Sequence, residues 1–484
     1  MGCELSMEGG YPVAKIVLEV PDSLKTLQRP VQQFMNAVSG QVARGQSGGA
    51  AQYDRFEGRI GEQAAKLERE AHRVALAALE VNAPRLCING EEYVRVLENS
   101  LGSYKTQTGE VVLGRSLYRR VGRRNEKVVD LISLRAGVVG DGWLPGTARS
   151  MAHLLQQGTS REAEVTAQRV SRLPYSRSSF ETVGHEVGRL FCKRQADVED
   201  LLITEFVLPE ETSSVSVSLD RVSLPMEEPR PKPSGKPRKD APKNPISRVY
   251  RMAYCGTVTL HDGEGKGLHT IRYGCMPEGD EYELVATMAR DVLALREQTV
   301  CLPLSLLCDG AKEMWNLLEK RFDGQFGFST RLIDFWHLVE KLSAAAAAID
   351  REAASATLKR WRLRLLNCNA AAEEILDELN ASGREHVRIG EGRPVHEAIT
   401  YLENNAHRMR YASSRRRGLP IGSGNVEATC KSLISQRMKR SGARWKNDTG
   451  EHIIQLRALS LSDRWDRAMD ITLRAPSVRV KVAA

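Results

Sequence analysis

Several features on which secreted, membrane-spanning or disulfide-stabilised proteins depend are missing from this 484-residue chain. Its nine cysteines include no Cys-x-x-Cys pair, so the sequence indicates neither a disulfide framework nor a zinc cluster. No apolar run approaches the roughly eighteen residues of a membrane span, and no basic segment followed by an apolar core opens the chain. We therefore expect a cytoplasmic protein, in a reducing compartment, with no membrane partner.

Aromatic residues are also scarce, at 6%, which fits a sugar-binding cleft poorly and argues against a glycosidase built on paired carboxylates. Acidic residues are outnumbered, with 61 Asp and Glu against 70 Lys and Arg, which gives a net charge of +9. A basic excess favours a polyanionic partner, and nucleic acid is the first such class to consider. The alternative is that a mild excess serves solubility alone.

The N-terminal half is expected to be mainly helical. Residues 1–50 are interpreted as a loosely ordered lead-in, and residues 51–206 as a helical DNA-binding region. Within it the sequence predicts a helix over 52–80, a hairpin over 102–122, and helices over 148–157, 161–170 and 178–191, the last running on toward 206. The last three helices are typical of a helix-turn-helix that reads DNA, or of an ordinary three-helix packing unit.

The C-terminal half is predicted to form an α/β core. Residues 213–349 alternate three strands, helix, strand, helix, strand, helix, which indicates a mixed sheet with helices on its faces. A flexible, basic, proline-rich loop is expected at 227–246. Residues 350–417 are interpreted as a helical insertion, residues 418–470 complete the core, and 471–484 form a tail.

Three acidic residues occupy places where α/β sheets carry their chemistry. Asp220 lies on the polar face of a strand, Asp309 follows the buried strand expected over 300–308, and Glu427 lies at the start of a helix. Each has a structural alternative, because Asp309 could cap a helix and Glu427 could pair with Lys431. Three oxygen ligands suit two Mg²⁺ or Mn²⁺ ions in phosphoryl transfer, with no protein nucleophile.

The segment around Glu427 is strongly basic. Between residues 408 and 446 there are eleven Lys and Arg and one acid, Glu427. A lone carboxylate would weaken DNA binding there unless it held a cation. We expect phosphate contacts from five residues of this segment: Lys431, Arg437, Lys439, Arg440 and Arg444. Trp445 is expected either to stack on a base or to pack in the core.

Four motifs resemble a known family. They are SVSLDRV from Ser216, LLCDGA from Leu306, LIDFWHL from Leu332, and GLPIGSGNVEA from Gly418 with QRMKRSGARW after it. Together they are similar to the DDE core of ISKra-type bacterial insertion-sequence transposases, which are related to the Mutator-like group. The resemblance spans about 213–467 and is most specific in its last block.

The resemblance implies an RNase H-like domain in which Asp220, Asp309 and Glu427 form the metal triad. It implies metal-dependent DNA cleavage and strand transfer, with the element's terminal inverted repeats and target DNA as partners and a homo-oligomer in the DNA complex. Asp334 and His337 are similar to a D-x-x-H signature near the active site, or else mark a helix start. Family members often carry a cysteine-bearing ribbon, whereas residues 103–126 here contain no cysteine.

Two other functions remain open. A nuclease or junction resolvase can use the same fold and metals without rejoining DNA. A domesticated transposase can bind DNA with no catalysis, although the three carboxylates argue against that.

Overall fold

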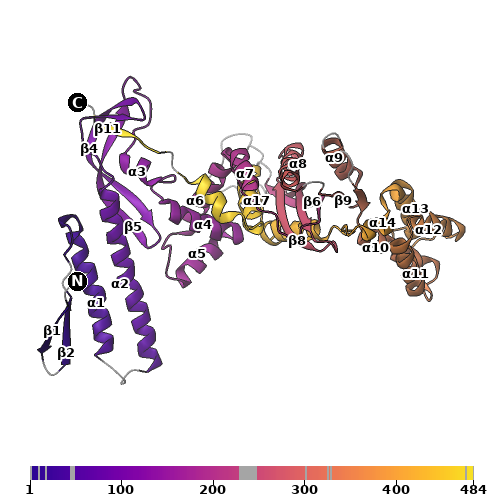
Figure 1. Cartoon of the computed structure of the whole chain (residues 1–484), viewed down its shortest axis with the longest axis horizontal. Helices are drawn as coiled ribbons and strands as arrows, with labels where there is room; N and C mark the ends of the chain where they lie inside the picture. The colour runs from indigo at the N-terminus through magenta and orange to yellow at the C-terminus, as the bar shows by residue number, and fades with distance from the viewer. Residues whose placement is uncertain are drawn as a thin grey trace, which may run out of the picture. The chain divides into compact units, whose positions relative to one another are not determined.

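The computed structural model describes residues 3–8, 11–16, 19–43, 49–227, 248–299, 302–323, 326, 330–474 and 477–482. The chain divides into two compact units, Met1–Val187 with Leu473–Ala484, and Gly188–Thr472 (Figure 1). The division lies inside α6 (Arg177–Lys193), upstream of the boundary expected at 206–213. The expected basic loop lies outside the described residues except for Glu227, which ends a strand.

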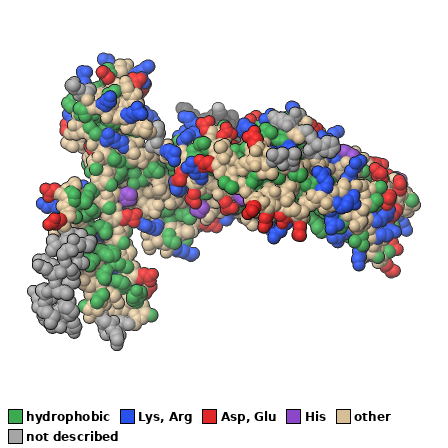
Figure 2. Space-filling model, in the orientation of Figure 1, with side chains coloured by type: hydrophobic (Ala, Val, Ile, Leu, Met, Phe, Trp, Pro, Cys, Tyr) green, Lys and Arg blue, Asp and Glu red, His purple; other side chains and the backbone are tan. Residues whose placement is uncertain are grey.

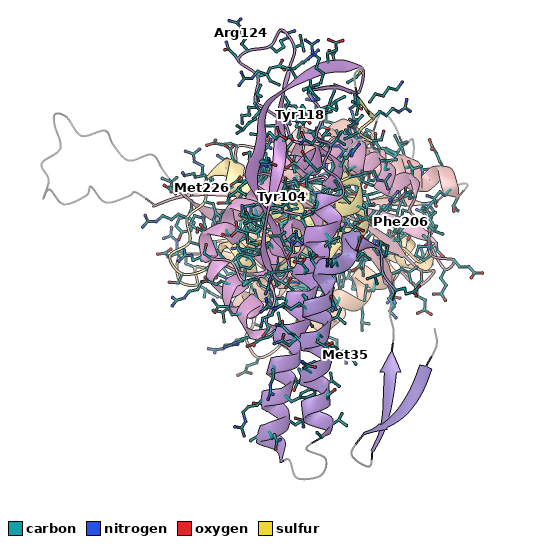
Figure 3. All side chains as sticks on the ribbon, turned by 90° about the vertical axis from the view of Figure 1, so that its left-hand side faces the viewer. Met35, Tyr104, Tyr118, Arg124, Phe206 and Met226 are labelled. Carbon is teal, nitrogen blue, oxygen red and sulfur yellow. The ribbon has the colours of Figure 1, made fainter. Side chains whose placement is uncertain are left out.

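The first unit combines a helical hairpin with a four-stranded antiparallel sheet of order β11-β3-β4-β5. Its strands are β3 (Arg85–Ile88), β4 (Glu91–Thr106), β5 (Gly109–Arg120) and β11 (Val480–Val482), and its helices are α1 (Gln28–Val42), α2 (Ala50–Ala77), α3 (Leu131–Ala136), α4 (Pro145–Gln157), α5 (Ser160–Arg169) and the start of α6. Tyr104 and Tyr118 of the two long strands are completely buried (Figure 3). The Tyr104 hydroxyl donates to Asp130, which also caps α3.

Two expectations for this unit need correction, and a third needs an addition. Residues 1–50 are not simply a loose lead-in, because they form an antiparallel pair of strands, β1 (Cys3–Glu8) and β2 (Tyr11–Ile16), a 3-10 turn η1 (Asp22–Leu27), and α1. The region 51–206 is mainly helical, as expected, but it also supplies three strands of the sheet, β3, β4 and β5. The expected tail contributes β11, whose pairing with β3 spans most of the chain and leaves no local signal. The predicted helices α2, α4, α5 and α6 are confirmed.

The second unit contains a five-stranded mixed sheet of order β10-β9-β6-β7-β8. Its strands are β6 (Ser214–Glu227), β7 (Arg248–His261), β8 (Gly267–Cys275), β9 (Leu304–Cys308) and β10 (Thr330–Ile333). The first three are antiparallel neighbours, and β9 and β10 run parallel to β6. The expected α/β layout with a mixed sheet is therefore confirmed.

Helices cover both faces of this sheet (Figure 1). Alternation along β7 sends Tyr254 into one core and Ala253 and Cys255 into the other. The first core includes side chains of α8 (Glu281–Gln298), α9 (Lys312–Phe322) and α10 (Phe335–Ile349). The second includes side chains of α15 (Gly424–Thr429), the π-helical η4 (Cys430–Ser435), α16 (Gln436–Met438) and α17 (Asn447–Leu461). Two further helices, α7 (Gln195–Thr204) and α18 (Trp465–Thr472), complete the unit.

The helical insertion predicted at 350–417 is confirmed as α11 (Ala354–Asn367), α12 (Ala371–Ala381), α13 (Pro394–Asn405), η3 (Ala406–Arg408) and α14 (Tyr411–Arg416). Trp361 and Leu365 of α11 are buried with the first core of the sheet. The insertion therefore packs onto the sheet and shares one continuous core with it. Among the helices that the structure describes, none has the length and apolarity needed to span a bilayer.

Candidate active site

Three aspartates lie at the same level of the sheet in neighbouring strands. Asp309 and Asp334 each follow the last residue of a strand, and those two last residues pair with each other. The last paired residues of β6 and β9 are Val217 and Leu306. Three residues further along each strand, the same register places Asp220 beside Asp309. Residues paired across neighbouring strands point to the same face of a sheet. The three side chains therefore share one face, where β9 and β10 end.

That face is the one covered by α15, η4 and α17. Asp220 alternates in phase with Leu224 and Met226 along β6, and both of those side chains lie in the second core. The Cys430 thiol, in η4, donates to Asp220 Oδ2 at 3.4 Å. The helix that carries Glu427 is thereby held against the strand that carries Asp220.

Asp309 emerges from the sheet in a tight turn. Its Oδ1 accepts a hydrogen bond from the Ala311 amide at 2.9 Å, but Ala311 itself is the N-cap of α9, so Asp309 is not that helix's cap. A Cβ on Gly310 would come 2.4 Å from a ring carbon of Tyr401, which only glycine avoids. The close approach of the α13 tyrosine therefore shapes the turn that presents Asp309.

Asp334 joins α10 to the loop before α15. Its side chain is completely buried, caps α10 through the His337 amide at 2.8 Å, and accepts hydrogen bonds from the amide and hydroxyl of Ser423. Burial alone would raise the pKa of Asp334, but the hydrogen bonds from His337 and Ser423 outweigh burial and lower the pKa to about 2. An ionised Asp334 thus anchors the Gly-Ser-Gly turn that starts the Glu427 helix.

Glu427 lies in the first turn of a helix that runs from Gly424 to Met438 with a π-helical middle. The predicted helix is confirmed, ending two residues before the expected Arg440, while its π segment was not expected. Val426 and Cys430 are buried, and the Glu427 side chain is 51% exposed. Within the described residues the ion-pair partner of Glu427 is His337, not Lys431.

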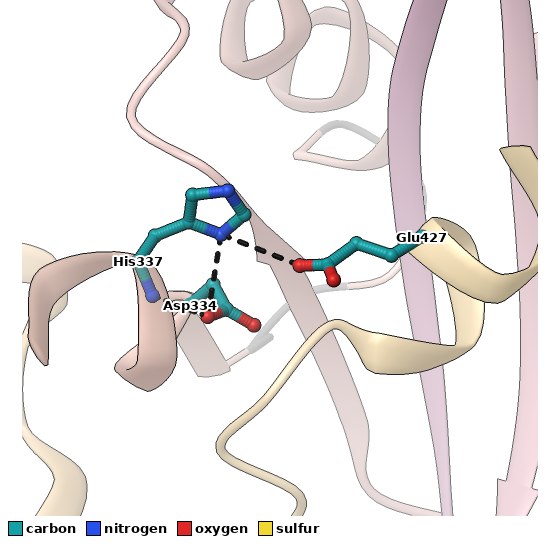
Figure 4. A group of neighbouring side chains, drawn as sticks. All are labelled: Asp334, His337 and Glu427. Carbon is teal, nitrogen blue, oxygen red and sulfur yellow. Dashed lines mark hydrogen bonds and ion pairs between the residues drawn. The ribbon is translucent and has the colours of Figure 1, made fainter. Parts of the chain in front are cut away.

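His337 connects the two carboxylates (Figure 4). Its Nδ1 atom lies 3.4 Å from Asp334 Oδ1 and 3.5 Å from Glu427 Oε1. The contact with Asp334 raises the pKa of His337 to about 9, despite partial burial, and the charges of Glu427 and Asp309 act in the same direction. The imidazole is therefore protonated near neutral pH in the metal-free chain, and it offsets part of the local negative charge.

Positive groups offset only part of the negative charge around Asp309 and Glu427, because the pKa of each is raised. Burial raises the pKa of Asp309, and the negative charge of Asp220 raises it further. Burial also raises the pKa of Glu427, with added repulsion from Asp334 and Asp220, while His337 acts in the opposite direction. Mutual repulsion among carboxylates is the condition that a divalent cation relieves.

One group of three metal-ligating side chains in the described chain has all its ligand atoms within 4.8 Å: Asp334, His337 and Glu427. Asp334 is a poor ligand, because three donors already use its two oxygens. His337 Nδ1 lies within ion-pair distance of both Asp334 and Glu427, so this nitrogen could bind a metal only after losing its proton. With the oxygens of Asp220, Asp309 and Glu427 nearby, the donor set fits a hard divalent cation.

The basic residues predicted to contact DNA fall into two groups. Lys431, Lys439 and Arg444 are exposed, and Arg440 is half-buried with its Nε on the Gln436 carbonyl. Arg437 does not fit a phosphate contact, because it is only 5% exposed.

The Arg437 guanidinium lies over the Trp445 ring, 5.1 Å from its centroid. Trp445 donates to the Met438 carbonyl and packs against the second core, so the packing alternative describes it better than base stacking. Both side chains support the helix rather than presenting a surface.

Sequence reasoning missed three contributors to the site: Ser423, Cys430 and Arg221. Ser423 stands in a Gly-Ser-Gly turn, a signal for a helix start but not for a buried bond to Asp334. Arg221 pairs with Glu313 of α9, and its positive charge lowers the pKa of Asp309 against the effect of burial. These contacts join residues far apart in the sequence, so no local pattern reports them.

Comparison of the sequence with protein-family models and with curated proteins gives no match. Among solved structures, the chain resembles one in a Drosophila P element transposase strand transfer complex. Sequence identity is 10%, the TM-score is 0.31, and the overlap covers 67% of this chain and 92% of that chain. A likeness this low leaves the function to be argued from the chain's own residues.

Proposed function

We propose that this chain is a DDE transposase that cleaves DNA strands and transfers them during movement of a bacterial insertion sequence. The observation that carries the proposal is the gathering of Asp220, Asp309 and Glu427, with Asp334 and His337, on one face of a mixed sheet. The α/β core with its helical insertion is the architecture that an RNase H-like catalytic domain would need.

Each residue has a distinct role in this proposal. Asp220, Asp309 and Glu427 would hold two Mg²⁺ or Mn²⁺ ions. Such ions, when bound, activate a water or a 3′-hydroxyl and stabilise the leaving oxygen of an in-line phosphoryl transfer. Asp334 orients His337 and the start of the Glu427 helix, and is a positioning residue. His337 supplies a positive charge, or a nitrogen ligand, beside Glu427.

The DNA would lie along the helix and loop that follow Glu427. Lys431, Lys439, Arg440 and Arg444 come from a segment whose only acid is Glu427, so phosphates reach the carboxylates through a positive surface. The partners are the element's terminal inverted repeats and target DNA, bound by an oligomer of the chain. Action on chromosomal DNA in the bacterial cytoplasm follows from these partners.

The test of this proposal is the product formed from DNA that carries the element's ends. We expect Mg²⁺ or Mn²⁺ to support both nicking at the ends and covalent joining of the cut 3′ end to a second, labelled duplex. EDTA should abolish both products. Nicking without joining would instead identify a nuclease or resolvase, and DNA binding without either product would identify a non-catalytic binding protein.

Neutralising the proposed DNA surface should flatten the salt dependence of DNA binding. The quadruple variant Lys431→Gln, Lys439→Gln, Arg440→Gln and Arg444→Gln should lower the slope of log K against log salt by about 3 to 4, because each lost phosphate contact removes about 0.9. Fluorescence anisotropy across a salt series measures that slope. Lys481→Gln, at an exposed position on β11, is the matched control, and an unchanged slope in the quadruple variant would reject this surface.

A further inference from the structure

The helical hairpin of the first unit has no core of its own. No residue of α1 is buried, and in α2 only Leu76 is buried, near the end of the helix. Leu76 belongs to a core with Tyr104 and Val111 of the sheet. Within the described residues, the N-terminal part of α2 therefore has α1 as its helical neighbour, and none of its side chains is buried.

The hairpin also exposes large apolar side chains. Met35 of α1 is 47% exposed, Tyr53 of α2 is 60% exposed, and Val42 at the end of α1 is 73% exposed. Figure 2 shows hydrophobic side chains gathered along this helical pair, and Figure 3 shows Met35 projecting beside it. Most helices in water owe their stability to burial of an apolar face. An αα-hairpin of this kind is half of a four-helix bundle.

The charges of α2 indicate which occupant completes the bundle. Residues 50–66 carry three acids and three bases: Asp54, Glu57, Glu62, Arg55, Arg59 and Lys66. None of the six is in an ion pair within the described part of the chain. A DNA or membrane surface would call for an excess of positive charge. Interspersed charges that sum to zero suit a surface that pairs with itself.

We propose that the α1–α2 hairpin is a dimerisation arm that packs against the same hairpin of a second copy of this chain. A two-fold arrangement places the same patch on both sides, so acids of one α2 meet bases of the other. The exposed apolar side chains Met35, Val42 and Tyr53 then face the partner copy, in the core of a four-helix bundle. The inference is independent of the catalytic proposal, because it rests on no residue of the second unit.

The arm is large enough for a stable contact. At 1.5 Å per residue, the 17 residues from 50 to 66 extend about 25 Å, and two helices side by side are about 20 Å wide. The two helices therefore present a flat area of about 500 Å² to a partner. The accessible area is larger because side chains protrude from that plane, and it comes close to the roughly 800 Å² that each partner buries in a standard interface.

Light scattering on the full-length protein, without DNA, tests the arm. We expect wild-type protein at micromolar concentration to have about twice the 53.8 kDa mass of one chain. The double variant Met35→Glu with Tyr53→Glu should have the monomer mass, because charges buried within the contact would stay unpaired. Both side chains are exposed in the single chain, so the variant should keep its circular dichroism spectrum. Leu101→Glu, at a 75% exposed position on β4, should remain dimeric.

Three outcomes would overturn the proposal that the hairpin is a dimerisation arm. A monomeric wild-type protein would show that the hairpin does not associate with itself. A double variant that stays dimeric would place the contact elsewhere. A double variant that loses DNA affinity with its mass unchanged would identify the hairpin as a nucleic-acid contact. Because none of these readouts involves cleavage, failure here is distinguishable from failure of the catalytic proposal.

Discussion

Asp309→Asn should lower strand cleavage and transfer by several orders of magnitude while the protein stays folded and bound to DNA. The substitution keeps the size of the side chain and the oxygen that accepts from Ala311, but it removes the charge that would hold a divalent cation. Metal stabilisation of the in-line transition state is expected to supply most of the catalysis. Assays with Mg²⁺ and end-bearing DNA measure the loss.

DNA binding provides the internal control for Asp309→Asn. Removing one negative charge from a basic surface should leave the affinity unchanged or increase it. Calorimetric titration with Mn²⁺ should lose the binding signal in the same variant. Asp377→Asn, at an exposed position on α12, should behave as wild type in all three measurements. A folded Asp309→Asn protein with near-normal strand transfer would defeat the assignment of Asp309 and the mechanism with it.

The sheet of the second unit could be predicted because its signals are local. The five residues of β9 are all buried and four of them are apolar, so a mostly apolar run indicates the strand, and Asp309 follows its end. The strand β11 could not be predicted in this way. It has three residues, and its pairing with β3 depends on a partner almost 400 positions away. The first half of β4 has exposed residues on both faces of the strand, so buried and exposed positions do not alternate there as they do in a half-buried strand.

The basic side chains show where charge alone misleads. Arg437 was assigned to DNA because it lies in a basic segment, yet it follows Leu433 by four residues and Ile434 by three, and both of those side chains are buried. Helical spacing therefore placed Arg437 on the packed face, and that signal was available. Lys431 and Arg444 lie off this face and are exposed.

The positions of the carboxylates in the sequence singled them out as candidates, but the structural role of Asp334 could not be predicted. The sequence treated Asp334 as a neighbour of the site, whereas the structure makes it a buried anchor with three hydrogen bonds. The bond to Ser423 joins residues 89 positions apart, so it depends on the fold of the whole unit. The same holds for the contact between Cys430 and Asp220.

Asp334→Asn should destabilise the protein and lower the pKa of His337. The amide cannot accept the hydrogen bonds of both His337 and Ser423 without turning its NH₂ group toward a donor, so about 2 to 4 kcal/mol of unfolding free energy should be lost at neutral pH. Without the Asp334 charge, the pKa of His337 should fall from about 9 toward its ordinary value. Urea unfolding and proton NMR titration of the metal-free protein measure the two effects. A purely structural role would not move the histidine titration.

Acid should shrink the stability difference between wild type and Asp334→Asn. The pKa of Asp334 in the folded chain is about 2, below its ordinary value of 3.8, so its ionisation stabilises the fold fully above pH 3.8. That contribution, about 2 kcal/mol, is lost as the pH falls toward 2. Urea unfolding at pH 6 and at pH 2.5 should therefore show a smaller difference at the lower pH.

Asp350→Asn is the matched control, because Asp350 accepts hydrogen bonds from two backbone amides at an exposed helix end. This substitution should cost less than about 1 kcal/mol of unfolding free energy at either pH. A difference between wild type and Asp334→Asn that stays constant from pH 6 to pH 2.5 would mean that Asp334 is not held as a charged anchor, and the link from β10 to the Glu427 helix would have to rest on other contacts.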